Sequence, residues 1–251
     1  MIRLISLRGA AAAVVVVGSA LLSGCNSPIE KAAEAREAAL SAPDSYQGYL
    51  SAQDAAGKMG CLFPTKECKD NLWKGRVVLQ EVIDNFLIRA AEQGNHRIIS
   101  HAFSHELRHS DRVMPSLTAK VSAIESLLNR LDDPSISPDT LYLVSNELRR
   151  GEYAVQNYEL AAYIAELAWQ RGNIRAANLL MHIHTESMDI GNAYLWSIRC
   201  IGECRTWNHD QYVTDLRDKL DPESILRIQA AAADDSQMRI FETRDLADFD
   251  L

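Results

Sequence analysis

The sequence FLIRAAEQGN at Phe86–Asn95 returns in altered form as IAELAWQRGN at Ile164–Asn173. Both segments place small residues near the end of an apolar run, followed by a polar pair and then Gly-Asn. Gly94 and Gly172 lie 78 positions apart, which is twice 39. A glycine just after a helix supplies the left-handed residue at which one helix ends and the next begins. The two segments therefore predict an internal repeat of helix pairs.

Most of the chain between residues 72 and 220 repeats apolar residues at spacings of three and four, as amphipathic helices require. No stretch alternates apolar and polar residues in the way that a half-buried strand does. The predicted fold class is all-α, with helix-hairpin repeats stacked into a short curved solenoid. The predicted helices are Leu72–Ala90, Arg97–His109, Leu117–Leu131, Thr140–Arg149, Tyr158–Gln170, Ile174–His184, Ala193–Cys200 and Asp210–Leu220.

The ending AAEQGN at residues 90–95 resembles the SEL-one-like repeat, a relative of the tetratricopeptide repeat. In that family, helix pairs of about 36 to 44 residues end in Ala-Ala-x-x-Gly-Asn, and an alanine opens the next helix. The segment AWQRGN at 168–173, followed by Ala176, resembles the same ending, and Asp189 with Trp196 resembles the family's second-helix signature. The resemblance covers roughly residues 72–210. It implies a noncatalytic protein-binding module: a scaffold, an adaptor, or an immunity-type lipoprotein that neutralises a secreted lipase.

The chain departs from that family in two places. The usual Leu-Gly-x-x-Tyr of the first helix is absent from residues 97–109, and a turn at residues 132–138 displaces the middle repeat. The number of repeats and the regularity of the superhelix therefore stay open.

The first 25 residues have the form of an export signal. Arg3 and Arg8 precede an apolar run over residues 10–22, and small residues lead into Cys25. The run is too short to span a bilayer comfortably, so cleavage is the better interpretation. The sequence LSGC ending at Cys25 resembles the lipobox of bacterial lipoproteins, which implies a diacylated cysteine as membrane anchor. An ordinary signal peptide with an incidental cysteine is the alternative.

This signal sets the predicted domains and location. Residues 1–24 are the lipoprotein signal peptide, and residues 25–56 a lipid-anchored tether or first helix. Residues 57–240 form the repeat domain, with residues 57–70 as a stapled loop, and residues 241–251 form an acidic tail. In lipoproteins an aspartate after the cysteine favours inner-membrane retention. Asn26 therefore implies an outer-membrane protein that faces the periplasm.

The charge balance argues against nucleic acid as a partner. Removing Arg3 and Arg8 from the 26 basic residues changes the formal net charge from −8 to −10, and no basic cluster is present. Phosphate binding needs clustered cations. The predicted partners are another protein and, through the anchor, a membrane.

Four cysteines remain when Cys25 carries lipid, an even number in an oxidising compartment. Local disulfides, Cys61 with Cys68 and Cys200 with Cys204, are favoured among three possible pairings. A bridge across the second spacing would strain or end a regular helix. A zinc site from the same four cysteines is the alternative, although neither spacing is typical of structural zinc.

The segment 105–109 reads HELRH, which has the His-Glu-x-x-His form. On a helix this form places His105 and His109 one turn apart to bind zinc, with Glu106 as general base. A zinc-dependent hydrolase is therefore the alternative function. In such enzymes the helix that carries the motif is buried and apolar, whereas here charged residues occupy it. Glu125 is the formal third ligand, but no recognisable second motif surrounds it. The prediction remains a protein with no catalytic residue, no metal and no cofactor.

The other histidines and the tryptophans give weaker signals. His101, His105 and His109 share a helix face and form either a metal- or proton-sensing face or a plain polar one. His182 and His184 are expected to be packing or solvent residues. Tryptophans hold partners in many helical-repeat proteins. The sequence has four: Trp73, Trp169, Trp196, predicted to be core, and Trp207, predicted to be exposed.

Overall fold

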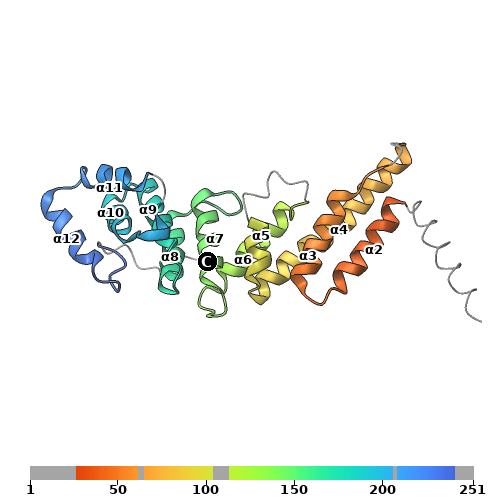
Figure 1. The fold of residues 1–251 in the computed structure, drawn as a ribbon, viewed down its shortest axis with the longest axis horizontal. Coiled ribbons are helices and arrows are strands. Elements are labelled where there is room, and N and C mark those ends of the chain that lie inside the picture. The colour runs from red at the N-terminus through yellow and green to blue at the C-terminus, as the bar shows by residue number, and fades with distance from the viewer. Residues whose placement is uncertain (1–26, 62–64, 104–112, 206–207, 241–251) are drawn as a thin grey trace, which may run out of the picture. The chain divides into compact units, whose positions relative to one another are not determined.

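The computed structural model describes residues 27–61, 65–103, 113–205 and 208–240 (Figure 1). Across these ranges the regular structure is helical with no strand, which confirms the all-α prediction. None of the described helices is both long and apolar enough to cross a membrane. The helices are α2 (Pro28–Leu40), α3 (Ser45–Lys58), α4 (Lys66–Gln93), α5 (His96–Phe103), α6 (Leu117–Leu128), α7 (Pro138–Arg150), α8 (Tyr158–Gln170), α9 (Ala176–Glu186), α10 (Ile190–Arg199), the 3-10 helix η3 (Gly202–Cys204), α11 (His209–Arg217) and α12 (Pro222–Ala232).

The chain divides into two compact units. One comprises Met1–Ile83 with Asp111–Val113, and the other comprises Asp84–Ser110 with Met114–Leu251. The predicted repeat domain, residues 57–240, crosses this division.

The first unit contains a helix hairpin in which α2 packs against α3. Ser27 begins α2 with a reciprocal capping box to Glu30, and Asp44 caps α3. Gly75 of α4 lies so close to this hairpin that an added Cβ would be 2.9 Å from the Pro28 carbonyl oxygen. Residues 28–58 are thus mostly helical and packed, and the tether alternative does not describe them.

The predicted loop at residues 57–70 is wrong at both ends. Helix α3 continues to Lys58 and α4 already begins at Lys66, so Cys68 lies in the first turn of α4. Thr65 caps that turn, since its Oγ1 accepts a hydrogen bond from the Cys68 amide at 3.2 Å. Glycines and cysteines in this stretch suggested a longer loop, but the disulfide joins the loop to a helix end.

In the second unit, the consecutive helices α7 to α10 pack on one another in sequence order. Helix α7 packs on α8, α8 on α9 and α9 on α10, while α10 also packs on α11 and α12. Their buried side chains are rich in alanine, which lets helix axes approach closely. Helix α12 is absent from the helices predicted from the sequence, although Asp221 caps it and Pro222 opens it.

Three helix ends share one backbone geometry. Gly94, Gly172 and Met188 each adopt a positive φ, of 73°, 98° and 64°. The amide of the following residue then donates to a carbonyl five positions earlier, as in a Schellman motif. These bonds run from Asn95 to Ala90 (2.8 Å), from Asn173 to Ala168 (2.9 Å) and from Asp189 to His184 (2.8 Å). The repeated Gly-Asn pair of the sequence therefore marks a repeated turn, and Met188-Asp189 is a further example without glycine.

The side chain after this turn starts the next helix. The Oδ1 atom of Asn95 accepts from the Ile98 amide, and the Asn173 Oδ1 accepts from the Arg175 amide. Asp189 caps α10 by accepting from the Asn192 amide at 3.2 Å. One dipeptide thus closes a helix with its backbone and opens the following one with its side chain.

Two arginines connect segments that are far apart in sequence. Arg171, after α8, donates to the carbonyl oxygens of Leu131 (2.9 Å), Asp133 (3.1 Å) and Ile136 (3.2 Å). Arg130 donates in the same manner to the carbonyl oxygen of Ala91 at the end of α4, at 2.8 Å. Each guanidinium therefore donates hydrogen bonds to carbonyl oxygens at helix ends and turns, where no helical N–H is available as a donor.

Candidate interaction surfaces

An open apolar groove lies between α6 and the connection from α7 to α8; we call it the α6 groove. Its volume is about 690 Å³. The floor is formed by buried Ile124, Leu148 and Leu160, whereas Leu117 and Val155 are 61% and 89% exposed. The lining residues are Leu117, Val121, Ile124, Glu125, Leu128, Leu148, Gly151, Glu152, Tyr153, Ala154, Val155, Asn157 and Leu160.

Lys120 fixes one wall of the α6 groove. Its Nζ donates to the Tyr153 hydroxyl at 3.2 Å and lies 4.4 Å from the centre of that ring. The Tyr153 ring also meets Phe103 edge to face, with ring centres 5.8 Å apart. Because Lys120 is only 7% exposed, its charge is directed into the protein.

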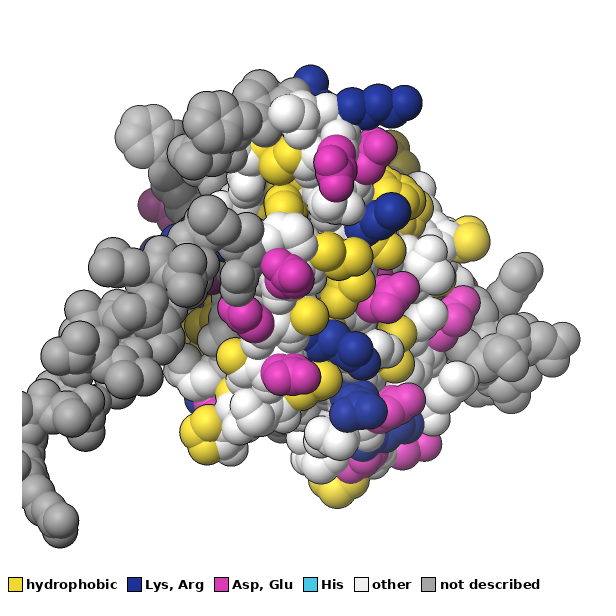
Figure 2. Space-filling view, turned by 90° about the vertical axis from the view of Figure 1, so that its right-hand side faces the viewer, with side chains coloured by type: hydrophobic (Ala, Val, Ile, Leu, Met, Phe, Trp, Pro, Cys, Tyr) yellow, Lys and Arg dark blue, Asp and Glu magenta, His cyan; other side chains and the backbone are white. Residues whose placement is uncertain are grey.

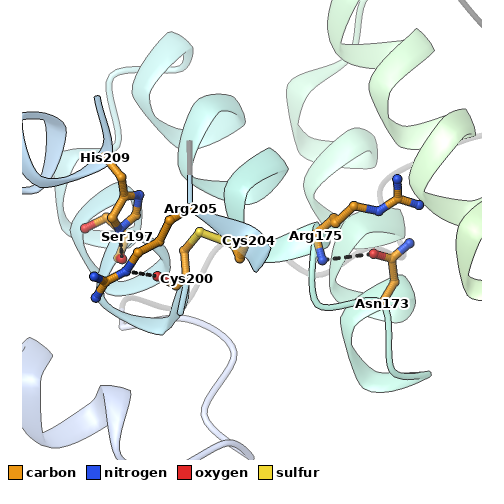
Figure 3. Close-up of a disulfide and its surroundings, with 7 residues drawn as sticks. All are labelled: Asn173, Arg175, Ser197, Cys200, Cys204, Arg205 and His209. Atoms are coloured by element: carbon orange, nitrogen blue, oxygen red, sulfur yellow. Dashed lines mark hydrogen bonds between the residues drawn. A yellow bond between two sulfur atoms is a disulfide. The ribbon is translucent and has the colours of Figure 1, made fainter. Parts of the chain in front are cut away.

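The second candidate surface surrounds the Cys200–Cys204 disulfide, and we call it the disulfide pocket. Helix α10 ends at Arg199, with Cys200 as its C-cap, so the helix ends where the bridge begins. The sulfur atoms lie 2.04 Å apart. Arg205 Nε donates to the Cys200 carbonyl oxygen at 3.3 Å, and His209 Nε2 lies 3.0 Å from the Ser197 carbonyl oxygen (Figure 3). These contacts hold the chain reversal around the bridge.

The disulfide pocket has a volume of about 520 Å³ and an apolar entrance. Ile174 and Ile201 are 46% and 68% exposed there. Trp169 lies on the pocket wall and meets Trp196 edge to face, with ring centres 5.5 Å apart. Trp196 itself is fully buried, as the sequence predicts.

Arg199 closes one side of the disulfide pocket. Its Nη2 donates to the carbonyl oxygens of Ala231 and Asp234 at 3.0 and 2.6 Å. Burial lowers the pKa of this guanidinium, while the carboxylates of Asp235 and Asp234 oppose that change. Arg199 therefore fastens the end of α12 through these two hydrogen bonds.

A buried polar network connects the end of α9, the start of α10 and Ile240. His184 Nδ1 lies 3.1 Å from Asp189 Oδ2, which also accepts from Asn192 Nδ2 at 2.8 Å. Asn192 in turn accepts from the amide of Ile240 at 2.9 Å. Since Asn192 is fully buried and His184 only 4% exposed, the network lies in the protein interior and stabilises the fold.

The same region contains a buried ion pair. Arg239 Nε donates to Glu166 Oε1 at 2.6 Å, with the two side chains 16% and 9% exposed. Burial raises the pKa of the Glu166 carboxyl, although the hydrogen bond and charge of Arg239 oppose this. Together with the Ile240 amide, the pair holds residues 239–240 against α8 and α10.

The structure places both local cysteine pairs at bonding distance, with the Cys61 and Cys68 sulfurs 2.19 Å apart. The lipidation residue Cys25 lies outside the described residues, as do Trp207 and the tail at 241–251. His105, Glu106 and His109 also lie outside, so the HELRH prediction has no described geometry. The part of the chain that the structure describes contains no group of His, Cys, Asp or Glu placed to hold a metal ion.

The remaining predicted residues belong to different helices. Glu125 is exposed on α6 and lines the α6 groove. Trp73 is 69% exposed on α4, in the first unit. His182 meets Tyr212 edge to face, with ring centres 5.6 Å apart, and burial lowers its pKa. His182 and His184 thus both pack within the fold, as the sequence predicts.

The exposed apolar residues of the two surfaces were not among the predicted site residues. Leu117 begins α6, and Val155 stands in the short connection before α8. Apolar residues at such places face solvent unless a partner covers them. Their position beside helix ends is the sequence signal that could have identified them. On the face shown in Figure 2, hydrophobic side chains are interspersed with acidic and basic ones.

Comparisons with protein-family models, curated proteins and solved structures gave no significant match.

Proposed function

We propose that this chain is a membrane-anchored, periplasmic protein-binding module without catalytic activity. One observation carries the proposal: the consecutive helices α7 to α10 pack on one another, and the left-handed turn at Gly94 recurs at Gly172 and Met188, which join α8 to α9 and α9 to α10. Such hairpins bury their apolar faces against neighbours and form a short curved solenoid, whose extended surface suits a protein partner. The exposed apolar residues of the α6 groove and the disulfide pocket support binding.

The proposal includes membership of the SEL-one-like repeats. The turns at Gly94-Asn95 and Gly172-Asn173 support it, because the glycine conformation and the asparagine cap explain why the consensus has these residues. Within that family, scaffold, adaptor and immunity-type roles all require a held protein partner. Which role applies depends on the partner.

The proposed anchor is the acylated Cys25 that follows a signal peptide of residues 1–24, and the proposed location is the outer membrane. Two or three acyl chains suffice for stable attachment, since each buried methylene contributes about 0.8 kcal/mol. Radiolabelled palmitate should enter the wild-type chain, and the Cys25→Ala variant should lose both the label and outer-membrane fractionation. Label in the variant would show that lipid is attached elsewhere.

The binding function is tested by co-purification from envelopes, followed by reconstitution with the purified partner. We expect one discrete protein that binds the lipidated chain at stoichiometric ratio. The alternative hydrolase is tested on the same sample, by metal analysis after zinc-replete expression and by the Glu106→Gln variant. Stoichiometric zinc together with hydrolysis that this variant abolishes would overturn the noncatalytic proposal.

A further inference from the structure

The α6 groove combines an apolar floor with a rim that carries one carboxylate without a salt bridge in the described part of the chain, that of Glu125. Glu125 is exposed at its edge, and no hydrogen bond or ion pair joins its carboxylate to another described residue. Glu152 lies on the opposite side of the groove, paired with Arg150. The adjacent cation, Lys120, is buried and directed to the Tyr153 hydroxyl, so it does not offset Glu125 at the surface.

The rim is formed before any partner binds. Tyr153 is held by Lys120 and Phe103, and Gln156 donates from Nε2 to the Arg149 carbonyl oxygen at 2.8 Å and to the Tyr158 hydroxyl at 3.0 Å. The connection that carries Val155 is therefore fixed at both ends. A fixed apolar residue that is 89% exposed loses little conformational entropy on binding.

We propose that the α6 groove binds an apolar helical segment of a partner protein that carries a lysine or arginine beside its apolar side chains. The apolar side chains cover Leu117 and Val155, and the cation faces Glu125. The net charge of −10 that remains after Arg3 and Arg8 are removed attracts such a segment over a longer range. This inference rests on the proposed binding function and adds the location and chemistry of the contact.

The test uses the lipidated full chain in phosphatidylcholine nanodiscs and two synthetic helical peptides. Both peptides contain the same leucines, one of them photoreactive, and differ in having lysine or glutamate at every polar position. We expect the lysine peptide to bind about tenfold more tightly than the glutamate peptide. Its photo-adducts should map to residues 117–128 and 151–157. Empty nanodiscs measure binding to the lipid alone.

Variants distinguish binding at the α6 groove from attraction by the overall charge of the protein. Leu117→Ser with Val155→Ser should weaken the lysine peptide at least about tenfold, since both apolar contacts are lost. Glu125→Gln should weaken it about threefold, whereas Glu223→Gln, an equal charge change at an exposed position of α12, should leave it unchanged. Circular dichroism checks that each variant is folded.

The inference fails if both peptides bind equally, if Glu223→Gln has the effect of Glu125→Gln, or if the adducts map elsewhere. If the peptides fail in this way while a purified partner still binds the chain, only the groove assignment is overturned. Absence of any protein partner overturns the binding function itself.

Discussion

Met188 holds the left-handed conformation that glycine holds at the two related turns. This conformation costs about 1 to 2 kcal/mol for a residue with a Cβ. The side chain is 79% exposed, so little packing offsets that cost. Met188→Gly should therefore raise the free energy of unfolding by about 1 kcal/mol, measured as a higher urea midpoint with an unchanged slope.

Gly172→Ala is the matched control for the same physical effect. At φ 98° the alanine would be strained, and no atom lies within 4 Å of the added Cβ, so no clash contributes. The variant should lose about 1 to 2 kcal/mol. A destabilised Met188→Gly or an unaffected Gly172→Ala would contradict the strain argument.

Asp189 makes stability dependent on pH at the acid end. Burial raises the pKa of its carboxyl, but hydrogen bonds from His184 and Asn192 outweigh this and hold the pKa at about 2. A carboxyl with a lowered pKa stabilises the fold above its unfolded value of 3.8, and that contribution is lost as pH falls towards 2. The loss corresponds to about 2 kcal/mol.

We expect the free energy of unfolding of Asp189→Asn to decline less than that of the wild type between pH 5 and pH 2. Glu166 acts with the opposite sign, because its raised pKa favours the fold at low pH and that contribution is lost as pH rises. Unfolding titrations at a series of pH values and fixed ionic strength give the pH dependence of the free energy of unfolding for the wild type and for Asp189→Asn. Parallel curves for wild type and Asp189→Asn would refute the assignment.

At the scale of elements, Arg171 joins the end of α8 to the segment between α6 and α7. The three donors of a lysine ammonium diverge from one nitrogen, whereas Arg171 contacts its three carbonyls from two separate nitrogens, Nη1 and Nη2. Arg171→Lys should therefore cost about 2 kcal/mol of unfolding free energy in thermal or urea denaturation. Arg175→Lys is the control: it changes an exposed pair with Asp139, whose two side chains are more than half exposed, and should cost well under 1 kcal/mol.

The two disulfides should differ in reactivity. Cys200 and Cys204 are 0% and 4% exposed, whereas Cys61 and Cys68 are half-buried. A mild reductant should open Cys61–Cys68 first, as detected by alkylation and mass spectrometry. Replacing Cys200 and Cys204 with serine should lower the free energy of unfolding by about 2 kcal/mol. Earlier opening of the buried bridge would contradict the structure.

Individual elements show how far sequence reasoning extends. The sequence predicts α8 at its observed bounds, and in the structure Asn157 caps its start while Gly172 follows its end. It places α9 two residues early, since Asn173 first forms a turn by accepting from the Arg175 amide. It omits α12, although Asp221-Pro222 is a standard opening, because the apolar periodicity there is short.

At the scale of the whole molecule, helix content follows from sequence periodicity, but the surfaces do not. The burial of Trp196 is predictable from the resemblance of its segment to a repeat motif. The α6 groove depends on Lys120 reaching Tyr153 from a helix 33 positions away, and no local pattern indicates that contact. Exposure of Val155 likewise follows from tertiary packing.

The central claim is that this helical array binds a protein through its exposed surface. The most direct measurement places a photoreactive amino acid at Val155, or at Leu226 on α12 as control, in the full-length protein expressed in cells. Leu226 is 68% exposed but lies outside both candidate surfaces. We predict a single discrete adduct from Val155, with a protein that binds the purified wild-type chain, and none from Leu226. Identical adduct patterns at both positions, or no adduct at either, would contradict the account.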